Sequence, residues 1–231
     1  MRELSPAEWT AVELSLRIAV VATVWALPFG IAIGWLLARG NFWGKTVLDG
    51  IVHLPLVLPP VVTGYLLLIW FGRKGPVGAF LYDHFGIVFA FRWTGAALAS
   101  GVMGFPLLVR PIRLALGTID RRLEHAAATL GANAVLVFFT VTLPLALPGI
   151  IAGVLLCFAR ALGEFGATIT FVSNIPGETQ TISAAIYTFL QIPQGDAAAG
   201  RLVLVAIVLA LAALIAAEWL GRRATTRFHG E

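Results

Sequence analysis

Four neutral hydrogen-bond donors lie close together in the last third of the chain. They are Thr168, Thr170, Ser173 and Asn174. Hydroxyl and amide groups can bind a tetrahedral oxyanion without carrying a charge, and neutral donors suit a pathway that must release what it binds. If the chain carries an anion across a membrane, some of these residues would line its route. The alternative is that their hydroxyl groups donate to carbonyls of their own helix.

Two ionisable residues, Arg160 and Glu164, stand just before these donors and four positions apart. On a continuous helix they share one face. Ionisable side chains at membrane depth usually mark a pathway or a contact with a partner. Two interpretations remain open: an ion pair with a structural role, within the helix or between subunits, and a gate.

The residue types needed for catalysis do not form a recognised motif. Residues 40–46 end in Gly-Lys-Thr, as a phosphate-binding loop does, but three residues separate the two glycines where four are needed. The four histidines form no zinc motif, and the single Cys157 excludes an intramolecular disulfide and a thiolate metal cluster. We expect a chain that is not an enzyme and that binds neither a metal nor a nucleotide itself.

The composition places the chain in a membrane. Hydrophobic residues make up 59% of the 231 positions, charged residues only 12%, and the mean hydropathy is +0.90. A soluble domain carries roughly 25% charged residues, so a soluble protein is excluded. The net charge of +4 does not indicate nucleic-acid binding, because the basic residues cluster at the ends of apolar runs, where they anchor loops at a lipid surface.

Five apolar segments are long enough to cross a bilayer, which predicts a single all-α transmembrane domain over residues 1–231. The segments are 16–38, 47–71, 94–116, 134–159 and 202–220. Pro55, Pro59 and Pro60 must break the second of them. The less apolar connection 160–201 is long enough for re-entrant or interfacial pieces, so a sixth partial span remains open.

The distribution of Lys and Arg predicts that the loop 117–133 is cytoplasmic, with the N-terminus outside and the C-terminus inside. In this orientation nine basic residues are cytoplasmic: Arg39, Lys45, Arg110, Arg113, Arg121, Arg122, Arg222, Arg223 and Arg227. Six lie on the outer side: Arg2, Arg17, Arg73, Lys74, Arg92 and Arg201. Arg160 lies near a boundary and is not counted.

The loop between the third and fourth segments predicts a short helix over about 120–135. It is rich in alanine, Asp120 and Glu124 suit the positive end of a helix dipole near its start, and Gly131 is placed to end it. An exposed helix with small side chains offers a smooth surface to another protein. An ordinary amphipathic loop helix is the alternative.

The same loop resembles the EAA loop of binding-protein-dependent ABC importer permeases, which reads Glu-Ala-Ala, three residues, Gly, nine residues and Ile-x-Leu-Pro. The matching positions are Ala126, Ala127, Gly131 and 141–144, which read Val-Thr-Leu-Pro. His125 stands where the family has its glutamate, and Glu124 lies one position earlier. A histidine thus stands at the position of the family's acidic contact to the ATPase subunit, and a helix would present Glu124 next to it.

The resemblance implies that the loop is a coupling helix that docks into a groove of a separate ATP-hydrolysing subunit, which would bind ATP and Mg²⁺. The residues it assigns to this contact are Glu124, His125, Ala126, Ala127, Gly131, Leu143 and Pro144. It also implies a homodimer of the chain in the cytoplasmic membrane, with two ATPase subunits, one periplasmic or extracellular binding protein and alternating access.

A second resemblance concerns the cargo. Residues 158–181 are similar to the corresponding segment of molybdate permeases and, more loosely, to that of sulfate permeases. The likeness extends to residues 54–60 and to Thr63 and Gly64. It implies molybdate import, with sulfate, thiosulfate or tungstate as alternative cargoes. A stand-alone secondary transporter or a membrane enzyme is the alternative of another class.

Overall fold

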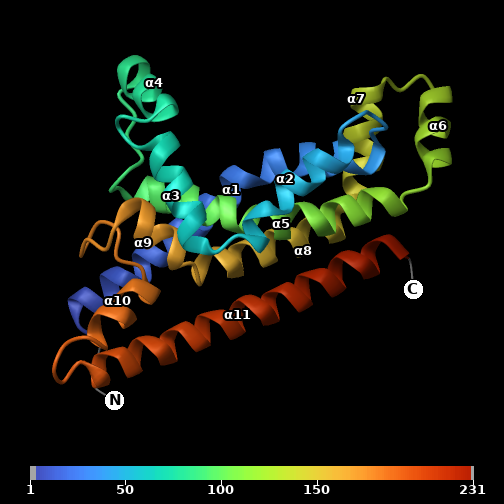
Figure 1. Ribbon diagram of the computed structural model, residues 1–231. Helices are drawn as coiled ribbons and strands as arrows, with labels where there is room; N and C mark the ends of the chain where they lie inside the picture. The colour runs from blue at the N-terminus through green and yellow to red at the C-terminus, as the bar shows by residue number, and fades with distance from the viewer. Residues whose placement is uncertain (1–3, 230–231) are drawn as a thin grey trace.

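The computed structural model describes residues 4–229, which form helices joined by loops (Figure 1). Arg2 of the charge count lies outside this range, and the side chains of Arg222, Arg223 and Arg227 are also outside the described part. The helical structure confirms the predicted all-α class. Among the described residues, four helices are long and apolar enough to cross a membrane, and a bent helix pair makes a fifth crossing if it is one broken span.

The first helix, α1 (Pro6–Arg39), begins ten residues before the predicted span at 16. Its start is fixed by a capping box in which Ser5 Oγ accepts from the Glu8 backbone N–H, and Glu8 Oε2 accepts from the Ser5 N–H. Sequence hydropathy missed this extension because the added turns carry polar residues. Of these polar residues, Glu8 and Ser15 are buried inside the protein, and Thr10 and Glu13 are exposed.

The core of the bundle is formed by α1, α5 (Trp93–Thr118) and α8 (Leu143–Leu162), which pack along one another. Leu108 and Ile112 of α5 are fully buried between the other two helices. Glycines allow the close approach: a Cβ added to Gly153 of α8 would lie 2.6 Å from the Leu108 carbonyl oxygen. Small residues at contacts are how membrane helices pack closely.

The predicted second span is broken into α2 (Lys45–Val57) and α3 (Pro60–Phe71), which meet at 115°. Pro59 caps α3 in an extended conformation and Pro60 is its first residue, so neither can continue the hydrogen bonds of α2. Pro55, in contrast, lies inside α2. The sequence predicted a break here, and the structure shows that it is a sharp corner. Helix α4 (Pro76–Phe85) follows on the same side as α3 (Figure 1).

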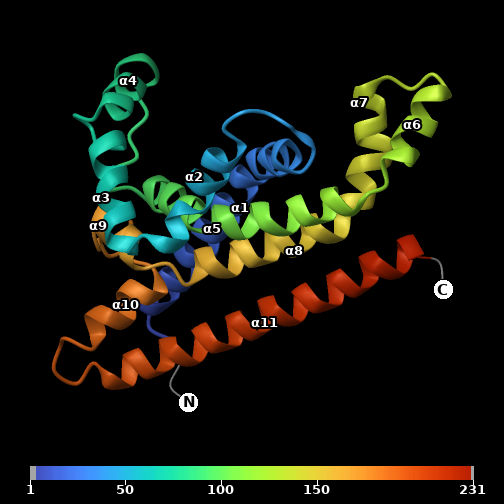
Figure 2. The same cartoon turned by 45° about the vertical axis from the view of Figure 1, so that its right-hand side comes forward.

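The chain then forms the loop helix α6 (Arg121–Thr129), the single turn α7 (Ala134–Val137) and a π-helical turn η1 (Phe138–Thr142) that runs into α8. Figures 1 and 2 both show α6 and α7 projecting beyond the end of the bundle opposite to α4. The loop helix therefore lies outside the membrane-spanning part, with much of its surface exposed.

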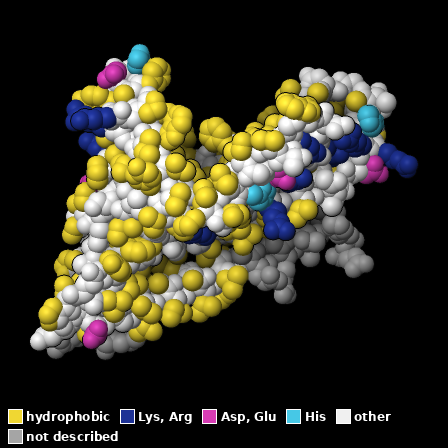
Figure 3. Space-filling view, viewed as in Figure 1, with side chains coloured by type: hydrophobic (Ala, Val, Ile, Leu, Met, Phe, Trp, Pro, Cys, Tyr) yellow, Lys and Arg dark blue, Asp and Glu magenta, His cyan; other side chains and the backbone are white. Residues whose placement is uncertain are grey.

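The connection after α8 contains α9 (Gly166–Val172) and α10 (Ile182–Phe189), and α11 (Asp196–His229) crosses back alongside α8. At 1.5 Å per residue, α9 and α10 reach only about 12 Å, which is too short for a ~30 Å bilayer core. The described part of the connection therefore contains no sixth crossing. In Figure 3 apolar side chains cover the middle of the visible face, and charged side chains gather mainly toward its two ends.

Candidate functional site

The exposed helix α6 has the local structure that its sequence predicts. Asp120 caps its start and accepts from the Arg122 backbone N–H at 2.9 Å. Gly131 follows its end with φ at +89°, a left-handed conformation that favours glycine. The helix ends at Thr129, earlier than the predicted boundary at 135, because the chain turns at Gly131 before α7 begins.

One side of α6 offers a small, partly apolar surface. No residue of α6 is buried, and His125 and Ala126 are both exposed. Leu123 is 50% exposed and Leu130, just after the helix, is 89% exposed. These leucines and the exposed Ala126 lie outside the membrane-spanning helices.

Leu143 and Pro144 were also assigned to the coupling contact, and the structure places them elsewhere in the loop. They are the first two residues of α8, and both are half-buried. A proline cannot donate to the carbonyl four residues earlier, and the π-helical turn η1 lies directly before it. These two residues therefore shape the entry of the chain into α8, while α6 carries the exposed surface.

Glu124 is turned toward its own chain. Its Oε1 accepts from Thr142 Oγ1 at 2.8 Å and from Arg39 Nη2 at 3.1 Å. Thr142 is the last residue of η1, and Arg39 is the last residue of α1. The carboxylate thus connects α6 to two other helices.

The hydroxyl groups of Thr168 and Thr170 donate to the backbone of their own segment, to the carbonyls of Phe165 and Gly166, each at 2.9 Å. Their hydrogens are therefore used inside α9 in this conformation. This is the second of the two interpretations given for these threonines. With their hydrogens used in this way, the two hydroxyl groups can only accept hydrogen bonds, and an anion needs donors.

Ser173 and Asn174 lie in the loop after α9. Ser173 is exposed and has φ +65° and ψ −166°, a conformation that is strained for any residue with a Cβ. The Asn174 amide donates to Thr188 Oγ1 at 2.7 Å. The buried Thr179 hydroxyl holds the loop by donating to the Ser173 carbonyl and accepting from the Ile175 N–H. Of the four predicted donors, Ser173 is the one whose side chain is exposed.

Arg160 and Glu164 form an ion pair, with 2.5 Å between Arg160 Nη1 and Glu164 Oε2. The Glu164 side chain is 1% exposed, and its other oxygen accepts from the Ala167 N–H at 2.8 Å. One carboxylate therefore neutralises the arginine at the end of α8 and satisfies an N–H of the first turn of α9. This geometry favours the structural interpretation of the pair over the gate.

A second charged cluster was not recognised from the sequence. Arg113 of α5 donates to Asp49 of α2 at 2.6 Å, and His53 Nδ1 lies 3.4 Å from the same Asp49 oxygen. The spacing of Asp49 and His53 was a signal for a pair on one helix face. Nothing in the sequence indicated that Arg113, 64 positions away, would join them.

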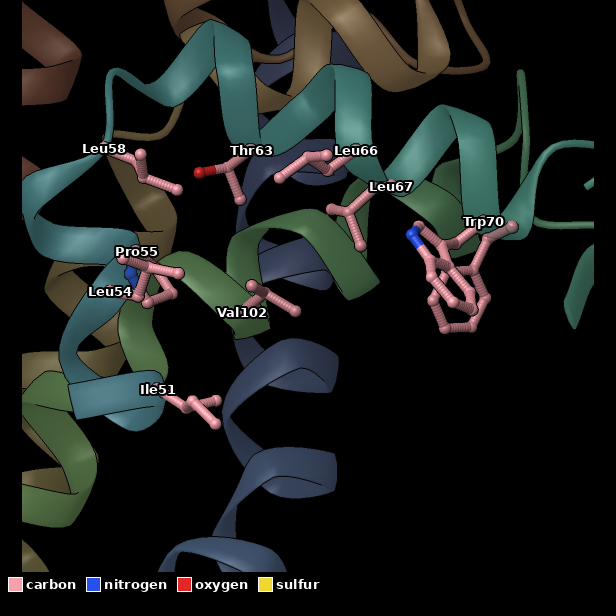
Figure 4. A pocket seen from close by; sticks show the side chains of 10 residues that line it. Ile51, Leu54, Pro55, Leu58, Thr63, Leu66, Leu67, Trp70 and Val102 are labelled. Atoms are coloured by element: carbon pink, nitrogen blue, oxygen red, sulfur yellow. The ribbon is translucent and has the colours of Figure 1, made fainter. Parts of the chain in front are cut away.

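An open apolar hollow of about 200 Å³ lies at the corner between α2 and α3 (Figure 4). It is lined by Ile51, Leu54, Pro55, Leu58, Thr63, Leu66, Leu67, Trp70, Phe71 and Val102. Among these ten lining residues, only Thr63 has a side-chain oxygen, and none has a charged side chain. An oxyanion needs several donors, and the lining that this chain provides has too few of them to bind one.

The structure is a bundle of apolar helices with an exposed loop helix between two membrane-crossing helices. The family model described as "Binding-protein-dependent transport system inner membrane component" matches residues 30–226. The chain belongs to this family. It is therefore an inner-membrane permease subunit of an importer, a component that is not itself catalytic, and the alternative of a membrane enzyme is excluded.

Curated relatives cover almost the whole chain. The molybdenum transport system permease protein ModB of Escherichia coli (strain K12) is 60% identical over 219 residues, which are 95% of this chain and 96% of the relative. ModB of Haemophilus influenzae is 58% identical over 94% of both chains. The sulfate transport system permease protein CysT of Salmonella typhimurium is 38% identical over 81% of this chain and 67% of its own length.

Solved structures share the fold at low sequence identity. A bacterial ABC transporter that imports alginate aligns with a TM-score of 0.73 at 20% identity, covering 95% of this chain and 80% of that chain. The MetNI methionine ABC transporter, in inward-facing conformations, aligns with a TM-score of 0.71 at 18% identity, covering 97% of this chain and 99% of that chain. These similarities confirm the ABC importer permease fold.

Proposed function

We propose that this chain is the permease of an ATP-driven molybdate importer. The observation that carries the proposal is the 60% identity, over nearly the full length of both chains, to a permease named for molybdenum transport. The lower identity to a sulfate permease, 38%, makes sulfate or thiosulfate the second cargo, and tungstate is the third because it has the shape and charge of molybdate.

The working unit in this proposal is a homodimer with two ATPase subunits and a periplasmic or extracellular molybdate-binding protein. ATP and Mg²⁺ bind to the ATPase subunits. Closure of the ATPase dimer moves α6 of both copies, and the movement switches the pathway between outward and inward openings. The exposed side chains of Ala126, Leu123 and Leu130 support this role, because they form an accessible surface to which a partner protein could bind.

The orientation we propose places α6 and the C-terminus in the cytoplasm and the N-terminus outside. The positive-inside rule supports it through the basic residues near α6. Arg110, Arg113, Arg121 and Arg122 all lie within 12 positions of Asp120 in the sequence. In this orientation, the loop that contains Ser173 faces the external binding protein, and Ser173 remains the proposed anion donor among the four sequence candidates.

Transport in proteoliposomes tests the proposal. The chain is co-purified with its ATPase subunit, reconstituted, and supplied with ATP inside and the molybdate-loaded binding protein outside. We expect labelled molybdate uptake that requires both the ATPase and the binding protein, and that exceeds sulfate uptake by about ten-fold or more. Uptake without the ATPase would indicate a stand-alone carrier, and preference for sulfate would reject the cargo.

A further inference from the structure

The loop helix α6 is joined to the bundle through one carboxylate. Glu124 Oε1 accepts hydrogen bonds from Arg39 Nη2 at 3.1 Å and from Thr142 Oγ1 at 2.8 Å. Arg39 Nη2 also donates to the Ile119 carbonyl at 3.1 Å, at the point where α5 ends. The ends of α1 and α5, the loop helix and the turn leading into α8 therefore meet at a single cluster.

The cluster is much less exposed than the rest of α6. The Arg39 side chain is 11% exposed and that of Glu124 24%, while Thr142 is 2% exposed. By contrast, His125, the next residue of α6, is exposed. Neighbouring positions of the same helix thus point in different directions, Glu124 into the protein and His125 away from it.

Hydrogen bonds to an ionised carboxylate are shorter and stronger than those between neutral groups, and they strengthen further where water is partly excluded. Arg39 is 85 positions from Glu124 and Thr142 is 18 positions away. A displacement of α6 therefore acts on α1 through Arg39 and on α8 through Thr142. Because α1, α5 and α8 pack along one another, a displacement passed to one of these helices also acts on the other two.

We infer that Glu124 is a positioning residue that fixes the coupling helix to the membrane helices, and that the contact with the ATPase is made by the exposed side of α6 that carries His125. The inference rests on the proposed function for the source of the force. It separates two tasks within the loop. His125 and Ala126 meet the motor subunit, and Glu124 transmits the movement.

The functional test compares variants in the reconstituted complex with the ATPase subunit. For Glu124→Ala we expect the ATPase to co-purify within about two-fold of the wild-type amount and ATP hydrolysis to continue, while molybdate taken up per ATP falls about ten-fold. Glu124→Gln keeps an acceptor oxygen and should lose less. Asp83→Asn, an exposed carboxylate variant on α4 at the opposite end of the molecule, is the matched control and should behave as wild type.

The partners of Glu124 give an internal check. Arg39→Ala should lower uptake per ATP. The double variant Arg39→Ala with Glu124→Ala should lose less than the product of the two single losses, because both single variants remove the Arg39–Glu124 contact. Losses that multiply in the double variant would overturn the inference. So would loss of ATPase co-purification in Glu124→Ala, since Glu124 would then be a docking residue, and so would unchanged uptake per ATP.

A structural measurement keeps the inference separate from the cargo. Amide hydrogen exchange over 121–129 is measured in the purified chain with Thr142→Val, which removes the donor but keeps the side-chain volume. We expect exchange to be about ten-fold faster than in wild type, and an unchanged rate would overturn the positioning role. If the wild-type chain failed to import molybdate at all, the proposed function would be rejected. The comparison of exchange rates between wild type and Thr142→Val would still test the positioning role of Glu124.

Discussion

Arg201 and Glu8 connect the first turn of α1 to the start of α11. The guanidinium donates from Nε at 3.1 Å and from Nη2 at 2.8 Å to the same Oε1 of Glu8. The Glu8 side chain is completely buried, and its other oxygen accepts from the Ser5 N–H. The pair thus joins two helices whose contacting residues lie 193 positions apart.

Removing the arginine should destabilise the fold. Arg201→Ala leaves a buried carboxylate without its countercharge, which costs roughly 3–5 kcal/mol. Thermal unfolding in detergent should show a clear fall in midpoint, and Lys74→Ala, at an exposed lysine after α3, should show none. Equal midpoints for the two variants would mean that Glu8 is not held by Arg201.

The Arg160–Glu164 pair should act on stability rather than on gating. Glu164→Ala removes both the ion pair and the hydrogen bond to the Ala167 N–H, and should lower the unfolding midpoint. Arg160→Ala should also lower it, because a buried carboxylate is left unpaired. Anion leak through liposomes with an unchanged midpoint would instead indicate a gate.

The contact between α5 and α8 should tolerate no side chain at Gly153. A Cβ there would lie 2.6 Å from the Leu108 carbonyl oxygen, which is backbone and cannot rotate away. Gly153→Ala should therefore cost roughly 1–3 kcal/mol. Gly117→Ala in α5 is the matched control, since nothing lies within 4 Å of its added Cβ, and should be neutral or slightly stabilising. Unfolding in detergent compares them, and equal stabilities would contradict the packing.

A bulky charge on the exposed side of α6 should block the motor subunit without unfolding the chain. Ala126→Arg should lower co-purification of the ATPase about ten-fold or more, because the arginine side chain would block the proposed docking surface. The unfolding midpoint should stay unchanged, since Ala126 is exposed. Asp83→Arg on α4 places the same side chain far from α6 and should leave the complex intact. Undiminished co-purification of Ala126→Arg would exclude this surface as the docking site.

Substitutions of Thr168 and Ser173 should affect molybdate uptake differently, because the Thr168 hydroxyl is already hydrogen-bonded and the Ser173 side chain is exposed. Thr168→Ala should leave molybdate uptake within about two-fold, because its hydroxyl already serves the Phe165 carbonyl. Ser173→Gly should relieve the strained backbone and stabilise the fold by roughly 1 kcal/mol, and Ser173→Ala should not. If Ser173 contacts the anion, both of its variants lower uptake at equal expression; full uptake in both would remove it from the pathway.

The sequence by itself determined the features that depend on composition and local chemistry. Low charge and long apolar runs are sufficient for an all-α membrane bundle, because the lipid core accepts no other open structure. The alanine-rich run between Asp120 and Gly131 predicted a short helix there, since helix propensity and capping act through the adjacent backbone. Pro59 and Pro60 were sufficient for the break in the second segment, because proline lacks the N–H that the helix needs.

The tertiary structure alone decided how distant residues meet. The 115° corner between α2 and α3, the pairing of Arg39 with Glu124 and that of Arg201 with Glu8 follow from packing, to which residues far apart in sequence contribute jointly. The same holds for Glu124, which the sequence left as a candidate contact for a partner. Only the position of α6 against α1 and η1 turns its carboxylate inward, because a side chain's direction on a short helix depends on what lies beside that helix.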